Sequence, residues 1–283
     1  MTAGAALLVV ELVAVTGAYL AAARRVRRWP SWRAAAFVGG AAAVALALLA
    51  LDGAAHRRLS AHMVQHLVLA FVAAPLLVAG SPLALALRAT GARARRLGGA
   101  AAAVGHPLVG WAALPATMAL THFGGLFEAA LEHPAVHAAE HVMWLLAAVA
   151  FWRPVVGSDP VPRRPGPVGR LVYLVLAAGP LSVVGVALSA STRPWYAAYA
   201  DEPGALADQH AAGALMWVGG GVALAGVIMV ATWAAVEREH RRRLAYEAAA
   251  GVTRVAVSDE AGGPPRAAPA QAAPVAASEE AAT

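Results

Sequence analysis

Seven long apolar runs, separated by short polar breaks, account for most of the chain. A hydrophobic run of about 20 residues is long enough to cross the hydrocarbon core of a bilayer as a helix. A helix is also a form in which a spanning segment satisfies its own backbone hydrogen bonds. The pattern therefore predicts an all-α, polytopic membrane helix bundle with seven transmembrane helices. The predicted spans lie near residues 4–23, 34–51, 62–87, 106–122, 135–152, 168–190 and 209–236.

Composition supports this class and limits the domain count. Hydrophobic residues make up 60% of the 283 positions and charged residues 13%, whereas about a quarter of the residues in a soluble domain are charged. We expect one membrane domain over residues 1–243. From residue 244 to residue 283, small residues, proline and glutamate dominate, which predicts a disordered cytoplasmic tail.

The arginines predict the orientation of the bundle. Every basic residue is an arginine, and only Arg57, Arg58 and Arg193 fall outside the segments that follow the first, third, fifth and seventh runs. Positively charged loops remain in the cytoplasm, so the amino terminus is predicted outside the cytoplasm and the carboxyl terminus inside. The net charge of +6 then reflects topology, and no nucleic-acid partner is expected. The first run has no basic residues before it and is expected to be a retained anchor, not a signal peptide.

Two compositional absences narrow the chemistry and the host. The chain has no cysteine, which excludes disulfides, thiolate metal sites and CxxC redox chemistry. Abundant alanine and the absence of lysine indicate a G+C-rich bacterium. The expected location is therefore a bacterial plasma membrane, with the lipid bilayer as the surrounding partner.

The histidines are concentrated on the predicted outer side. His62 and His66 begin the third run, and His137 and His141 begin the fifth. Residues at positions i and i+4 share a helix face, so each pair can present two imidazoles to one point. A lone histidine at a membrane interface is usually a hydrogen-bonded surface group, but two such pairs favour metal binding, because neutral imidazole is the commonest protein metal ligand.

Further candidate ligands lie at the same predicted depth. His122 ends the fourth run, Glu140 precedes His141, and Asp208 and His210 begin the seventh run above Met216. Thioether sulfur selects Cu(I), so copper is the expected metal, with zinc or haem iron as alternatives. Asp208 also fits a simple helix cap, and a methionine in an apolar helix is usually a packing residue. The predicted metal-site residues are His62, His66, His122, His137, His141, His210, Met216, Asp208 and Glu140.

Three motifs in order resemble one protein family. HMVQHL at 62–67 with GSP at 80–82, HAAEH at 137–141 and DQHAAG at 208–213 are similar to the multi-span CtaG family of cytochrome c oxidase assembly factors. The resemblance covers residues 40–236. By motif it carries over His62, Gln65, His66, His137, Glu140, His141, Asp208, Gln209 and Met216.

The resemblance implies an integral membrane factor that assembles a haem–copper cytochrome c oxidase. It further implies that oxidase subunits are the partners and that copper is held or supplied through the outer cluster. No nucleophile is arranged with a base, so we do not expect an enzyme.

Two other classes remain open from the residues alone. His137, Glu140 and His141 match an HxxEH pattern, which is typical of zinc hydrolases in which the glutamate is a general base. Alternatively, one histidine from each i, i+4 pair would ligate a single haem iron in an electron carrier. Zinc content would favour the first class, and a Soret band would favour the second.

Overall fold

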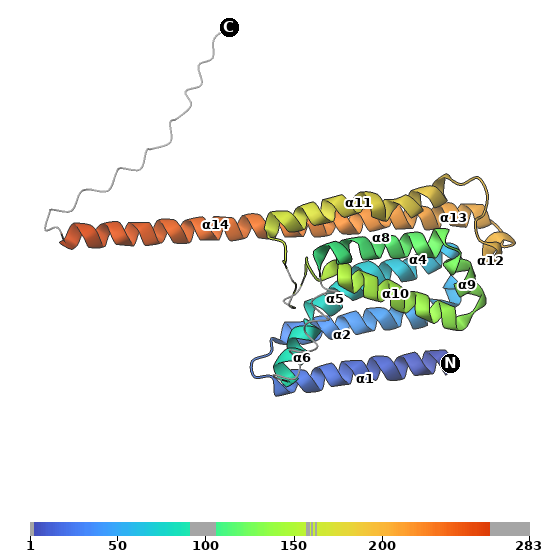
Figure 1. Ribbon diagram of the computed structural model, residues 1–283, viewed down its shortest axis with the longest axis horizontal. Coiled ribbons are helices and arrows are strands. Elements are labelled where there is room, and N and C mark those ends of the chain that lie inside the picture. The colour runs from blue at the N-terminus through green and yellow to red at the C-terminus, as the bar shows by residue number, and fades with distance from the viewer. Residues whose placement is uncertain (1–2, 91–105, 157–158, 160, 162, 261–283) are drawn as a thin grey trace, which may run out of the picture. The chain divides into compact units, whose positions relative to one another are not determined.

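The protein is described by a computed structural model over residues 3–90, 106–156, 159, 161 and 163–260, and in these residues it is helical with no strand (Figure 1). The chain forms two compact units, unit 1 over Met1–Thr232 and unit 2 over Trp233–Thr283. The helices of the first half are α1 (Ala3–Arg25), α2 (Ser31–Ala45), η1 (Leu46–Ala50), α3 (Asp52–Ala55), α4 (Leu59–Val68), η2 (Leu69–Ala73), α5 (Ala74–Ala79) and α6 (Pro82–Thr90). Those of the second half are α8 (Pro107–Phe123), α9 (Leu126–Glu132), α10 (Pro134–Trp152), α11 (Pro167–Ala190), α12 (Ala197–Ala200), α13 (Ala205–Ala214), η4 (Leu215–Gly219) and α14 (Gly220–Glu260).

Within the described residues, six helical segments are long and apolar enough to cross a membrane. This finding confirms the all-helical, multi-pass class. The remaining predicted span, near residues 106–122, forms α8, whose 17 residues measure about 26 Å at 1.5 Å per residue, slightly less than the hydrocarbon thickness of about 30 Å. The count of seven crossings and the orientation of the termini therefore stay predictions. The six segments are Leu7–Arg25, Ser31–Ala50, Leu59–Thr90, Pro134–Trp152, Pro167–Ala190 and Ala205–Ala248.

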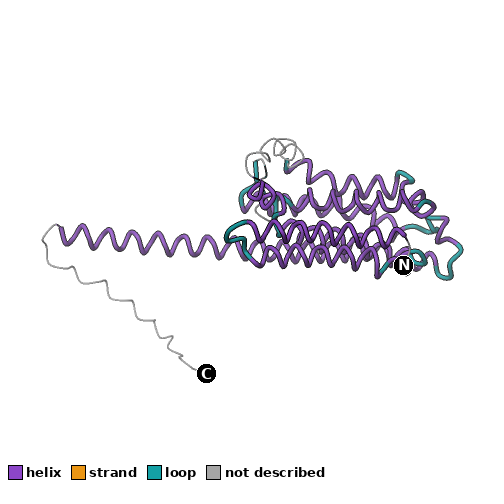
Figure 2. Tube along the Cα trace, turned by 90° about the horizontal axis from the view of Figure 1, so that it is seen from below, coloured by secondary structure: helices purple, strands orange, loops and turns teal. Residues whose placement is uncertain are grey.

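The long helices of unit 1 run side by side, and α8 packs against both α10 and α11 (Figures 1 and 2). Short helices α3, α9 and α12 lie at one end, which we call the histidine end because His62, His122 and His137 lie there. Helix α6 and the turn between α1 and α2 lie at the opposite end, which we call the arginine end because it holds Arg25 and Arg88. The candidate histidine ligands therefore lie at the end opposite to Arg25 and Arg88, although Arg57, Arg58 and Arg193 border the histidine end as well.

In the described part of unit 1, three π-helical segments interrupt the long helices: η1, η2 and η4. Side chains donate hydrogen bonds to carbonyls of two of them. The Gln65 Nε2 group donates to the Ala47 carbonyl at 2.9 Å, and Trp152 Nε1 donates to the Ala70 carbonyl at 2.6 Å. π-Helical turns are rare and often occur at functional sites, and these bonds supply partners to carbonyls in the disturbed segments.

Helices α11 and α13 approach each other closely through two glycines. A Cβ added to Gly213 would meet the Gly185 carbonyl oxygen at 2.6 Å, and one added to Gly185 would meet the Gly213 carbonyl oxygen at 2.8 Å. Small residues permit such close helix contact in membrane proteins. This contact fixes the start of the last long helix against α11.

Unit 2 contains the part of α14 that begins at Trp233. The structure describes residues 244–260 as helix, where the sequence predicted a disordered tail, and residues 261–283 lie outside the described residues. Alanine has the highest helix propensity, and ion pairs at i, i+4 spacing add support. Such pairs join Arg241 to Glu237 at 2.7 Å and Arg243 to Glu239 at 3.3 Å.

Candidate metal centre

Helices α4 and α10 each supply a group of buried polar side chains at the histidine end. On α4, His62, Gln65 and His66 are buried, at spacings of three and four residues that share one helix face. On α10, Glu140 and His141 are buried in the same way. Each helix thus presents a polar stripe near its start, above an apolar remainder.

The α4 histidines meet the α10 carboxylate at short range. His62 Nε2 and His66 Nε2 are 3.2 Å apart. Glu140 Oε1 lies 3.5 Å from His66 Nε2, and Glu140 Oε2 lies 3.9 Å from His62 Nε2. One ligand atom from each of these three buried side chains falls within 4.8 Å of the others. The three side chains therefore form a compact set of donors.

A second set of donors shares His62 with the first. One nitrogen from each of His62, His137 and His141 lies within 4.8 Å of the others. Their ring centroids are 4.4 Å apart for His137 and His141, and 5.2 Å apart for His62 and His137. We call the five side chains of these two sets the histidine–glutamate cluster: His62, His66, His137, Glu140 and His141.

A third set continues from the cluster toward the surface. Asp52, His56 and His137 also place one ligand atom each within 4.8 Å of one another. The His56 side chain is 57% exposed, and its Nδ1 lies 3.6 Å from Asp52 Oδ1. Sequence reasoning gave little weight to the loop residue His56 and missed Asp52, since nothing in their spacing points to His137.

Several ligand atoms of the cluster are buried without a hydrogen-bond partner. A buried polar atom without a partner costs about 1–3 kcal/mol, so several of them in one place destabilise the metal-free fold. A bound cation would satisfy those that face the cluster, and their chemistry fits metals that bind imidazole and carboxylate. The unpartnered atoms are His66 Nδ1, His137 Nε2, His141 Nε2, Glu140 Oε1 and Glu140 Oε2.

His122 on α8 lies beside the cluster. Its ring centroid is 6.4 Å from that of His66, and its Nδ1 lies 2.7 Å from the Tyr196 hydroxyl. Its Nε2 is buried without a partner. For Nε2 to accept a metal, Nδ1 must carry the proton and donate it to Tyr196, an arrangement that orients histidine ligands in metal sites. Burial raises the pKa of Tyr196, so its hydroxyl stays protonated.

Two of the predicted residues make other contacts. Asp208 accepts hydrogen bonds from the Ser60 backbone N–H and the Ser60 hydroxyl, so it caps the first turn of α4. His210 Nε2 lies 2.8 Å from the Ser191 carbonyl oxygen. The sequence also fitted Asp208 to a cap of its own helix, but Asp208 lies inside α13, whose N-cap is Gly204, and it bonds α4 instead. Both residues lie near the histidine end, and their side chains contact Ser60 and Ser191 at hydrogen-bonding distance.

Met216 and Trp144 adjoin the cluster on its inner side. Met216, in η4, is buried and lines a pocket together with His66 and Trp144. The Trp144 ring stacks on the His66 ring with centroids 4.1 Å apart and planes at 19°. Sequence reasoning missed Trp144, although its position three residues after His141 places it on the same face of α10.

Together these features define a class of protein. It is a multi-pass helical membrane protein with a buried histidine–glutamate cluster at one end of the bundle. Residues 17–238 match the sequence profile of the cytochrome c oxidase caa3 assembly factor family, Caa3_CtaG. The chain belongs to this family, as the sequence motifs predicted.

Curated relatives resemble the chain over most of its length. It is 28% identical over 257 residues to an uncharacterized protein of Mycobacterium leprae, covering 79% of this chain and 38% of the relative. It is 27% identical over 239 residues to uncharacterized proteins of Mycobacterium bovis and Mycobacterium tuberculosis, covering 74% of this chain and 35% of each relative. The chain thus spans less than two fifths of the length of these relatives. No solved structure matches it.

Proposed function

We propose that this protein assembles a haem–copper cytochrome c oxidase by binding copper in the histidine–glutamate cluster and supplying it to an oxidase subunit. Membership of the assembly factor family gives the process. The observation that carries the copper proposal is the set of unpartnered, buried nitrogens and oxygens on His66, His137, Glu140 and His141. Imidazole suits copper among the transition metals, and the chain has no thiol to compete.

His62, His66, His137, Glu140 and His141 would hold the ion, with His122 as an adjoining ligand oriented by Tyr196. Asp208 and His210 are left out because their side chains bond to Ser60 and Ser191. Met216 belongs to the adjoining pocket. The ligand atoms of the cluster are therefore nitrogen and oxygen, whereas the Met216 sulfur lies in the pocket.

The proposed location is the bacterial plasma membrane, with the histidine end outside the cytoplasm. Helix α8 would be the seventh crossing, since it packs along α10 and α11. A helix shorter than the hydrocarbon thickness is able to span a bilayer that thins locally around it. Arginines at the opposite end would then face the cytoplasm, as the positive-inside rule expects. Copper from outside the cell would reach the cluster directly.

The test combines gene deletion with complementation. Deletion should lower both oxidase activity and the copper content of the isolated oxidase, and wild-type protein should restore them. The double variant His62→Ala with His66→Ala should not restore them, whereas His133→Ala should, because His133 is an exposed histidine at the start of α10. Unchanged oxidase copper in the deletion strain would contradict the proposal.

Metal analysis of the purified protein tests the site itself. We expect stoichiometric copper in wild type and in His133→Ala, and loss of cluster-bound copper in the His62/His66 double variant. Zinc in place of copper would instead favour the hydrolase class. A Soret band in the detergent-solubilised protein would favour the haem-binding class.

A further inference from the structure

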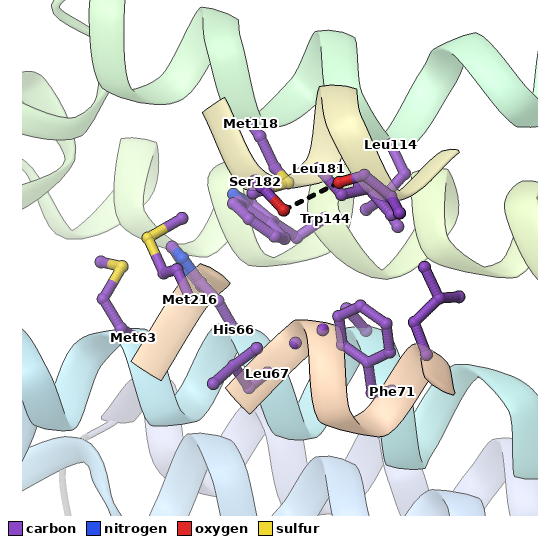
Figure 3. Close-up of a pocket in the computed structure, with 15 residues that line it drawn as sticks. Met63, His66, Leu67, Phe71, Leu114, Met118, Trp144, Leu181, Ser182 and Met216 are labelled. Carbon is purple, nitrogen blue, oxygen red and sulfur yellow. Dashed lines mark hydrogen bonds between the residues drawn. The ribbon is translucent and has the colours of Figure 1, made fainter. Parts of the chain in front are cut away.

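Three methionines from separate parts of the chain line one pocket in the membrane domain. Met63 lies on α4, Met118 on α8 and Met216 on η4. All three are buried, and the pocket that they line encloses about 480 Å³ including its open mouth. Figure 3 shows Met63 and Met216 grouped with His66 at one end of this pocket. We call Met63, Met118 and Met216 the methionine triad.

The rest of the lining is nearly free of competing polar groups. Leu114, Phe71 and Leu181 contribute apolar surface. The hydroxyl of Ser182 donates to the Ala178 carbonyl at 2.8 Å, so it is already engaged (Figure 3). The donors that face the pocket are therefore mainly thioethers and one imidazole. Thioethers are neutral, soft ligands that favour Cu(I) over zinc, magnesium or calcium.

His66 connects this pocket to the histidine–glutamate cluster. Its Nε2 lies 3.2 Å from His62 Nε2 and 3.5 Å from Glu140 Oε1. Its Nδ1, at the other nitrogen position of the ring, is buried without a hydrogen-bond partner. The same imidazole lines the pocket. Since the two nitrogens of an imidazole are distinct ligand atoms, His66 is able to serve either compartment.

The donor sets overlap in an ordered series from the surface inward. Asp52 and His56 share His137 with the next set, which shares His62 with the set that contains Glu140. His66 of that set also lines the pocket of the methionine triad. The His56 side chain is 57% exposed, whereas those of His62 and His66 are at most 2% exposed. Along this series the donors change from carboxylate and imidazole to imidazole and thioether.

We infer that the methionine triad and His66 form a second, Cu(I)-selective site inside the membrane domain. This second site receives its copper from the histidine–glutamate cluster. This inference rests on the proposed copper function. The series of overlapping donor sets supplies a continuous path, because each set shares a ligand with the next. A singly charged ion with neutral ligands is also less costly to bury in apolar surroundings than a divalent ion.

The test is anaerobic Cu(I) titration of the full-length protein against a chromophoric Cu(I) chelator. Met118→Leu with Met216→Leu removes two thioethers at nearly constant volume, which cores tolerate well. The matched control is Met229→Leu, since Met229 is 69% exposed. We expect two tightly bound Cu(I) ions in wild type and in the control, and one in the Met118/Met216 variant. X-ray absorption should show copper–sulfur scattering in wild type and its loss in that variant.

A second variant separates this inference from the proposed function. His137→Ala with His141→Ala should lose the cluster ion while keeping one Cu(I) with sulfur scattering, because the triad and His66 are intact. Two ions retained in the Met118/Met216 variant, or only one ion in wild type, would overturn the second site and leave the cluster proposal standing. Unchanged binding in the His137/His141 variant would instead overturn the cluster. Absence of Cu(I) in wild type would overturn both.

Discussion

The two ends of unit 1 treat their buried polar groups differently. At the arginine end, the Tyr19 hydroxyl donates to the Gly80 carbonyl at 2.7 Å, and Tyr173 donates to the Phe151 carbonyl at 2.9 Å. Asp159 accepts from the Ala84 backbone N–H at 2.8 Å, at the start of α6. At the histidine end, Glu140 keeps both carboxylate oxygens buried and without a hydrogen-bond partner.

We expect the arginine end to contribute mainly to stability and the histidine end mainly to metal binding. Bonded groups at the arginine end stabilise one arrangement of helices, and substitutions there should lower stability. Unpartnered groups at the histidine end cost stability, a pattern that is common where a site is built for a ligand. Substitutions there should reduce metal binding without lowering the stability of the metal-free protein. The predictions below probe this contrast, from the largest expected effect to the smallest.

Glu140→Gln should have the largest effect on metal binding. Loss of the carboxylate removes the only anionic ligand of the described cluster, and we expect affinity to fall by about 100-fold or more, since even residues that only orient ligands contribute 10–100-fold. The metal-free protein should unfold at the same temperature or higher. Chelator competition and thermal unfolding in detergent measure the two quantities. A destabilised metal-free variant would show that Glu140 is structural.

Gly213→Ala should lower the stability of the protein and leave metal binding largely unchanged. The added Cβ would meet Ser189 Oγ and the Gly185 carbonyl oxygen at 2.5 and 2.6 Å, and overpacking of this kind costs about 1–3 kcal/mol. Gly226→Ala is the matched control, because nothing lies within 4 Å of its added Cβ. Thermal unfolding should separate the two variants. Equal stability would mean that α11 and α13 are less closely packed than described.

Tyr196→Phe should weaken metal binding by about tenfold. It removes the hydroxyl that bonds His122 Nδ1 and orients that ring. Tyr199→Phe is the control, because the Tyr199 hydroxyl donates to the Ala55 carbonyl at 2.7 Å instead. The readout is again chelator competition. Equal affinities for both variants would exclude His122 from the metal site.

Asp159→Asn should have the smallest effect, near 1 kcal/mol, which is typical of a helix cap. Burial raises the pKa of Asp159, so the native state keeps this proton to higher pH than the unfolded chain does. The stability that this proton contributes is present at low pH and is lost as pH rises through the native pKa. The variant should lose this pH dependence in thermal unfolding above about pH 4, where a carboxyl of the unfolded chain loses its proton. An identical pH profile of unfolding in wild type and in the variant would show that Asp159 does not cause this pH dependence.

The sequence predicted the helical class well, because apolar length is a direct signal. It also predicted the i, i+4 pairs of α4 and α10, because each pair lies within one helix. It did not predict which pairs meet. Asp208 and Glu140 were equivalent candidates by depth, yet one caps α4 and the other faces His66. That choice depends on the rotation of each helix about its axis, which no local pattern encodes.

Three other features show where the sequence signal is weak. The 17 residues of α8 fall near the minimum spanning length, so its apolar run alone does not settle a crossing. Residues 244–260 have few large apolar side chains but many alanines, and local propensity favours helix there. Trp144 is uncharged and lies in an apolar helix, so the sequence does not distinguish it from a packing residue, although it stacks on His66.

The π-helical segment η2, Leu69–Ala73, has a consequence for engineering of this bundle. Such a segment is in effect a single inserted residue. Because the extra residue is accommodated locally, removing one residue there should restore ordinary helix and leave the flanking segments close to their present rotation. His62 and His66 would then still face Glu140, and α5 would keep its place against α2 and α10. A one-residue deletion in the regular helix between His66 and Leu69, by contrast, would rotate the two histidines by about 100° relative to α5 and turn them away from the carboxylate.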